Sequence, residues 1–213
     1  MKKFQFFTIL FFLLTGFVFF NCKKEVLIPV HENASKSGKS YDHVFHLWTK
    51  NQAIYHDFET VLFANATYHS SDFRIAFANA YENIFGSGSE YLKEVLLYLQ
   101  GDSEDYHEFF MGIITGKLEW NELETEDSIW QLRLIGKEQK FLLPISIKHI
   151  RINENLKVVY PYLNSFTRAY LVRFKKNFPD GTPVFTKYSD GFALEIVSSL
   201  GIAKLEWKFS HKL

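Results

Sequence analysis

The chain has 213 residues, of which 47% are hydrophobic and 23% charged, and its 24 basic side chains balance its 24 acidic ones. This composition excludes a wholly disordered chain, and the length suffices for one domain with a sizeable core or for two small ones. The absence of a basic excess excludes electrostatic binding to nucleic acid.

The N-terminus has the three regions of an export signal. Lys2 and Lys3 form a short basic start, and an apolar run then extends from residue 6 to residue 20. That run fits the apolar region of a signal peptide and is short for a membrane span of ~20 residues. The only cysteine, Cys22, follows at once, so the chain cannot form an internal disulfide.

This start resembles the signal peptides of bacterial lipoproteins, over residues 1–22. Their usual lipobox is a leucine, two small residues and the cysteine. Here Phe19, Phe20 and Asn21 precede Cys22, which is similar to the relaxed boxes of spirochaete lipoproteins. The resemblance implies a signal peptide over residues 1–21, cleavage before Cys22, and attachment of lipid (palmitate among the acyl chains) to that cysteine.

The resemblance also implies a place in the bacterial cell envelope. Lys23, rather than an aspartate, follows the cysteine, which favours the outer membrane over the inner one. An uncleaved anchor over residues 4–21 is the alternative, and both interpretations place residues 25–213 outside the cytoplasm. Cleavage would remove Lys2 and Lys3 and leave 22 basic against 24 acidic residues, a net charge of −2.

The chain after Cys22 is predicted to contain a tether and a single domain. Residues 22–41 are expected to be the lipidated cysteine and a flexible polar tether, and residues 42–213 the domain. At the start of the domain, the mixed spacing of apolar residues favours strands at 44–48 and 58–68, with a helix as the alternative for the second.

A helical pair is predicted at about 71–100. In the first helix, apolar residues recur at the spacing of one buried face, and Gly86 suits a left-handed C-terminal position. The second helix opens on a capping-box pattern at Ser87–Glu90 and ends at Gly101. Core packing explains both apolar stripes better than a groove for a partner.

From about residue 106 the pattern changes to the alternation of strands. Turn signals lie at residues 179–181 and 190–191, and Pro144 is expected at an edge or a bulge. Together these features predict a mainly β (α+β) fold, an Ig-like or fibronectin-like antiparallel β-sandwich with a helical insertion. The expected strands span residues 107–114, 130–134, 141–150, 158–162, 169–174, 183–188, 192–197 and 203–209.

No motif in the sequence assigns a catalytic residue, a cofactor or a metal. The G-x-S-x-G elbow, the phosphate-binding loops and the H-E-x-x-H pair are all missing. Three groups of residues remain as candidates for a metal or carboxylate site, for which chance spacing and solvated loop charge are the preferred explanations: His43, His46, His56 and His69; Asp102, Glu104, Asp105 and Glu108; and Glu119, Glu122, Glu124, Glu126 and Asp127.

The surplus of aromatic residues could line a groove for carbohydrate or peptide, although packing in the core is preferred. The residues in question are Trp130, Tyr160, Tyr162, Tyr170, Tyr188 and Trp207.

Two hypotheses for function follow. The first is a non-enzymatic binding or structural module of the cell envelope, held to a membrane by its lipid, with an envelope or extracellular protein or a glycan as partner. The second is an envelope hydrolase acting on glycan or peptide. The hydrolase would need a cleft in which carboxylates or histidines converge, around 102–108 or 43–69.

Overall fold

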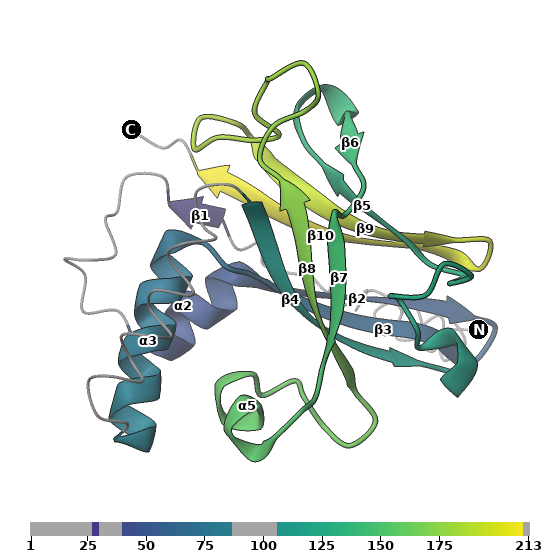
Figure 1. Ribbon diagram of the computed structural model, residues 1–213, viewed down its shortest axis with the longest axis horizontal. Coiled ribbons are helices and arrows are strands. Elements are labelled where there is room, and N and C mark those ends of the chain that lie inside the picture. Colours follow the sequence, from purple (N-terminus) through teal and green to yellow (C-terminus); the bar gives the residue numbers. More distant parts are fainter. Residues whose placement is uncertain (1–26, 30–39, 87–105, 211–213) are drawn as a thin grey trace, which may run out of the picture.

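The computed structural model describes residues 27–29, 40–86 and 106–210. Two five-stranded sheets lie face to face, and helices cover one end of the pair (Figure 1). All pairings between the named strands are antiparallel except that between β1 and β10. The predicted fold class, mainly β with a helical insertion in a sandwich of two sheets, is confirmed.

The first sheet, sheet A, runs in the order β1 (Leu27–Pro29), β10 (Gly201–Ser210), β9 (Gly191–Ser198), β5 (Gln131–Ile135) and β6 (Phe141–Leu142). The second, sheet B, runs in the order β2 (Thr49–His56), β3 (Glu59–Tyr68), β4 (Tyr106–Thr115), β8 (Arg168–Lys175) and β7 (Ser146–Ile150). The helical elements are α2 (Tyr41–Trp48), α3 (Ser71–Phe85), α5 (Glu154–Val159) and the short 3₁₀ turns η2 (Leu118–Trp120) and η3 (Lys137–Gln139).

The core lies between the sheets and is rich in aromatic rings. Trp207 of β10 is fully buried, and its ring lies 5.5 Å from that of Phe109 on β4, centroid to centroid. Its indole N–H donates to the carbonyl oxygen of Trp48 at 3.0 Å. One tryptophan therefore joins both sheets to the end of α2, and burial of such large apolar surfaces is the main stabilising contribution to the fold.

Helix α3 forms where the sequence predicts a helix. The hydroxyl of Ser70 accepts the backbone N–H of Phe73 at 3.0 Å, and Gly86 ends the helix with a φ of 57°. Glycine takes this left-handed conformation without the steric cost that a Cβ brings. The predicted second helix, over residues 87–100, lies outside the described residues.

The prediction of a strand at residues 44–48 was wrong, because these residues belong to α2. Tyr41, Val44, Phe45 and Trp48 follow helical spacing, and the hydroxyl of Ser40 caps the helix. Their apolar face is buried against the core and against α3, which supplies the tertiary contacts that decide the conformation of so short a segment. The strand predicted at 58–68 is confirmed as β3.

Two other predicted strands are absent from the structure. Residues 154–159 form α5, capped by Asn153, so the strand expected at 158–162 does not exist. Across the turn at 179–181, pairing is limited to one bridge between Asn177 and Pro183. The backbone N–H of Val184 donates to Lys176 beside this bridge, and its carbonyl oxygen accepts from Lys137, which draws this loop onto the end of β5.

The remaining differences concern boundaries. The strand expected over 141–150 is two strands, β6 in sheet A and β7 in sheet B, so the chain changes sheets around Pro144. Leu27–Pro29, within the predicted tether, form β1 on the edge of sheet A, and Ile28 is buried. The structured domain therefore begins before residue 42.

Candidate functional site

A group of charged and polar side chains lies buried where α3 meets sheet B. Glu108 of β4 stands opposite Arg173 of β8 in the strand register, and Arg74 comes from α3. His69 follows β3 directly, and its backbone N–H donates to the carbonyl oxygen of Glu108 at 2.9 Å. Tyr160 reaches the same point from the end of α5. Three strands and two helices thus converge on one carboxylate.

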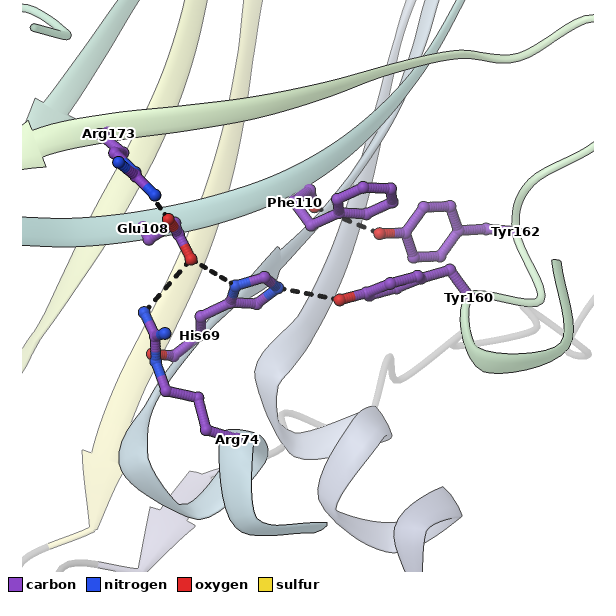
Figure 2. Close-up of polar contacts among 7 residues, drawn as sticks. All are labelled: His69, Arg74, Glu108, Phe110, Tyr160, Tyr162 and Arg173. Atoms are coloured by element: carbon purple, nitrogen blue, oxygen red, sulfur yellow. Dashed lines mark hydrogen bonds and ion pairs between the residues drawn. The ribbon is translucent and has the colours of Figure 1, made fainter. Parts of the chain in front are cut away.

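Both oxygens of Glu108 are engaged (Figure 2). Oε1 lies 2.9 Å from Nδ1 of His69 and accepts an N–H of Arg74 at 3.3 Å. Oε2 accepts from Nε of Arg173 at 2.7 Å. Charge-assisted hydrogen bonds of this kind are about twice as strong as those between neutral groups.

The imidazole of His69 links Glu108 to Tyr160, whose hydroxyl lies 2.9 Å from Nε2 (Figure 2). With an ionised Glu108, Nδ1 carries the proton and Nε2 accepts from the tyrosine hydroxyl. The ring also stacks on that of Phe73, at 5.3 Å and 8°. The histidine is therefore fixed in orientation and tautomer by neighbours on every side.

The environment sets the charge of each member. Burial alone would raise the pKa of Glu108, but the hydrogen bonds from His69 and Arg173 and the charge of Arg74 outweigh it and lower that pKa to about 2. Burial lowers the pKa of His69, against the opposing effect of Glu108. Burial raises the pKa of Tyr160 well above its usual value. At neutral pH the group holds one carboxylate, two guanidinium ions, a neutral imidazole and a phenol.

A carboxylate, an imidazole and a hydroxyl in series can relay a proton in catalysis. Here the relay is closed: the side chains of Glu108 and His69 are 1% and 5% exposed, and Tyr160 is 3% exposed. Within the described part of the chain, no side chain of this group lines the groove described below. Its evident role is to hold α3 and the end of α5 to sheet B.

Among the described residues, the structure brings together one candidate from each of three predicted groups: His69, Glu108 and Tyr160. Exposed His46 and His56 each lie beside an aspartate of their own segment, Asp42 and Asp57 respectively. Among residues 27–29, 40–86 and 106–210, no three His, Cys, Asp or Glu side chains form a group that could hold a metal. Cys22 and the candidates Asp102, Glu104 and Asp105 lie outside these ranges.

The other two candidate groups are dispersed. From the acidic stretch 119–127, Glu122 and Glu124 pair with the guanidinium of Arg168 at 3.2 and 3.3 Å. Most of the aromatic candidates pack in the core, as preferred from the sequence: Trp130, Tyr160, Tyr170 and Trp207 are buried and Tyr162 is partly buried. Tyr188 differs, because it is 75% exposed.

Tyr188 lines an open groove of about 730 Å³ on the outer face of sheet A. The floor includes Ala193 and Glu206, which are paired across β9 and β10. The walls are the turn between β5 and β6 and the loop between β8 and β9. The loop approaches so closely that a Cβ on Gly136 would collide with the carbonyl oxygen of Val184.

The groove carries both signs of charge. Its charged lining residues are Lys137, Lys140, Lys204 and Lys208, with Glu138, Asp190 and Glu206. Several of these are paired: Nζ of Lys204 lies 2.9 Å from Glu206, and that of Lys140 lies 3.6 Å from Glu138. Sequence reasoning missed the groove because its lining comes from four separate segments, and only Tyr188 gave a signal.

In the described part of the chain, no helix is both long and apolar enough to cross a membrane. No family model matches the chain, and neither the curated proteins nor the solved structures include a match.

Proposed function

We propose that this chain is a lipid-anchored protein of the bacterial cell envelope that acts as a non-enzymatic binding module. Lipid on Cys22 is its membrane attachment, with the outer membrane as the favoured site. The apolar run before the single cysteine supports the anchor. The groove on sheet A supports the binding role, because clefts with a few placed polar groups are where proteins most often hold ligands.

One observation carries the choice of a binding module over an enzyme. The carboxylate–imidazole pair, Glu108 and His69, is sealed in the protein, whereas the open groove is lined by charges of both signs, several of them paired, and by an exposed tyrosine. A hydrolase must bring water and substrate to its acid and base. Paired charges beside an aromatic ring instead suit a polar envelope partner, either an extended peptide or a glycan.

The hydrolase remains the second candidate, favoured by the Glu108–His69–Tyr160 relay itself. The two hypotheses differ in whether the protein converts a substrate into product. The lipidated chain is incubated with purified peptidoglycan and with envelope peptides, and products are measured by mass spectrometry. The binding module yields no product; hydrolysis abolished by His69→Gln would establish the enzyme instead.

Binding is tested in cells with a photo-crosslinking amino acid at position 188, in the groove, and at Ile84, a half-exposed residue of α3, as control. The proposal expects a discrete adduct with one envelope protein or glycan from position 188 and none from position 84. The Tyr188→Ala variant should bind that partner more weakly. Equal or absent crosslinking at both positions would contradict a binding role for the groove.

A further inference from the structure

The two most exposed large apolar side chains of the described residues, Phe58 and Leu118, lie at one end of the molecule, whereas the next two, Phe166 at 77% and Tyr188 at 75%, belong to other loops. Phe58, in the turn between β2 and β3, is 104% exposed, and Leu118, just after β4, is 88% exposed. Tyr55 beside the same turn is 67% exposed, and Ile202 at the β9–β10 turn is 60% exposed. Single exposed apolar residues are ordinary, but a group of them at one place marks an interaction surface.

Backbone contacts show that these residues share an end. Gly116 donates to the carbonyl oxygen of Val61 at 3.1 Å, which brings the segment leading to Leu118 beside the β2–β3 hairpin. A Cβ on Gly201 would meet the side chain of Ile54, so the β9–β10 turn adjoins the same hairpin. In Figure 1 both hairpin turns lie at the right of the molecule, away from α2 and α3. We call Tyr55, Phe58, Leu118 and Ile202 the apolar end.

The fold does not require apolar residues there. Phe58 occupies a tight turn in which Asp57 has a φ of 52°, and turns of this kind favour small polar residues. Leu118 begins a 3₁₀ turn that buries none of its residues. Within the described part of the chain, both side chains leave most of their surface in solvent.

The charges around the apolar end suit an uncharged interface. His56 and Asp57 pair at 3.2 Å, and Lys117 lies over the ring of Trp120 at 4.5 Å. Glu59 and Glu119 add negative charge, so this end does not have the basic cluster that binds anionic lipid. Tyrosine and phenylalanine at hairpin tips fit the interfacial region of a bilayer of zwitterionic lipids, where amphipathic and aromatic rings are favoured.

A fully extended tether would bring the attachment point near the same end. β1 runs parallel to β10 with Leu27 opposite Lys208 and Pro29 opposite Ser210, so the Leu27 side of β1 faces the Gly201 end of β10. From Lys208 back to Gly201 the strand covers about 24 Å. The chain from Cys22 to Leu27 spans at most ~17 Å, so lipid on Cys22 can reach within ~7 Å of the level of Gly201. So short a tether keeps the domain close to the bilayer, and the exposed side chains select this end.

We propose that the apolar end rests in the interface of the bilayer that holds the anchor, as a second membrane contact that orients the domain. This inference depends on the lipid anchor proposed above. Phe58 and Leu118 would enter the headgroup region beside the lipid of Cys22. The groove, on the outer face of sheet A along residues 204–208 of β10, would then lie to the side of this contact and remain open to the aqueous phase.

The test uses the full lipidated protein, purified from membranes and reconstituted in vesicles of phosphatidylcholine and phosphatidylethanolamine. Because lipid blocks Cys22, Phe58→Cys and Leu118→Cys each offer one reactive thiol for an environment-sensitive fluorophore. Tyr188→Cys, 75% exposed, is the matched control. Quenching is compared for nitroxide groups on the acyl chains and for iodide in the water, and circular dichroism confirms that each variant is folded.

The proposal expects blue-shifted emission and quenching by the acyl-chain nitroxides at positions 58 and 118, and quenching by iodide alone at position 188. Iodide quenching at positions 58 and 188 alike would overturn it. So would protection from iodide at 58 without nitroxide quenching, because a protein partner or a second copy would then cover this end. Failure of the proposed anchor is detected beforehand with the unsubstituted protein. Without lipid on Cys22, this protein would not float with the vesicles, and its Cys22 would react with the fluorophore. That result would also remove the basis of this inference.

Discussion

At the scale of single residues, Glu108 is the centre of the fold's polar interior. Its carboxylate compensates the charges of two arginines while holding a histidine. Burying an ion pair gains little over apolar packing, but removing one partner leaves a charge without compensation in a medium of low dielectric. The network therefore specifies how α3 meets sheet B, and it is vulnerable to the loss of any one charge.

Replacing Glu108 by glutamine tests this role. Glu108→Gln keeps the shape and removes the charge, and we expect the free energy of unfolding in urea to fall by about 3–5 kcal/mol. Glu206→Gln, which removes one partner of the exposed Lys204 pair, is the control and should cost less than about 1 kcal/mol. Equal small losses in both variants would show that the network does not hold the fold.

A second residue, His107, makes stability depend on pH. It is 4% exposed, and burial together with Lys176 lowers its pKa to about 3. An unfolded histidine binds a proton below pH ~6.5. As the pH falls from that value towards 3, the unfolded chain therefore gains a proton that the folded chain does not, and stability is lost. The pKa of Glu108 is also lowered, so further stability is lost as the pH falls from the usual pKa near 4.5 to the lowered value of about 2.

We expect His107→Phe to reduce the dependence of unfolding free energy on pH between 6 and 4 by about one proton, ~1.4 kcal/mol per pH unit. Phenylalanine can keep the stacking on Phe185, whose ring lies 4.0 Å away. Tyr68→Phe is the control, since it removes the hydrogen bond to Nδ1 and leaves the buried imidazole in place. An unchanged slope in His107→Phe would contradict a buried neutral histidine.

At the scale of elements, the sequence predicted those helices and strands whose ends are marked by local signals such as turns and caps. Alternation and glycine-containing turns predicted β8, β9 and β10, and the stripe ending at Gly86 predicted α3. Residues 44–48 and 158–162 were mistaken for strands because β-branched and aromatic residues occur in both, and tertiary burial decides their conformation. β1 has only three residues in register with β10, too short for a periodic signal.

The contribution of the N-terminal cap of α3 can be tested by substitution. Ser70→Ala removes the acceptor for the N–H of Phe73 and should lower the unfolding free energy by about 1 kcal/mol. Ser71→Ala, one residue later and exposed, provides the comparison and should change it by less than about half as much. Equal effects in urea unfolding would show that the cap contributes nothing beyond helix propensity.

β1 offers a direct test of where the domain begins. Ile28 is 4% exposed on the edge of sheet A, so Ile28→Ala should lower the unfolding free energy by about 2–5 kcal/mol. Ile84→Ala, at a half-exposed position of α3, should cost far less. A neutral Ile28→Ala would mean that residues 27–29 belong to a free tether, as the composition of this segment suggested.

At the scale of the whole molecule, the sequence predicted the class of fold but not the position of a site. The charge network is assembled from residues 69, 74, 108, 160 and 173, and the groove from four segments, so both depend on strand register and sheet order. Neither can be derived from local periodicity. The sequence contributed the proposed attachment, because an export signal is linear and can be interpreted without the fold.

The molecule has two functional ends if both proposals hold. The apolar end with Phe58 and Leu118 would face the bilayer, and the groove with Tyr188 would face the aqueous side. The proposed attachment at Cys22 underlies both, because it would determine the compartment and limit the distance between domain and membrane.

The measurement that tests this attachment most directly is the intact mass of the protein isolated from bacterial membranes, with Cys22→Ser in parallel. We predict a chain that begins at Cys22 and carries a diacylglyceryl group, and a Cys22→Ser chain without lipid that retains residues 1–21. A membrane-bound chain that keeps residues 1–21 and a free thiol at Cys22 would contradict the lipid anchor and support an uncleaved N-terminal segment instead.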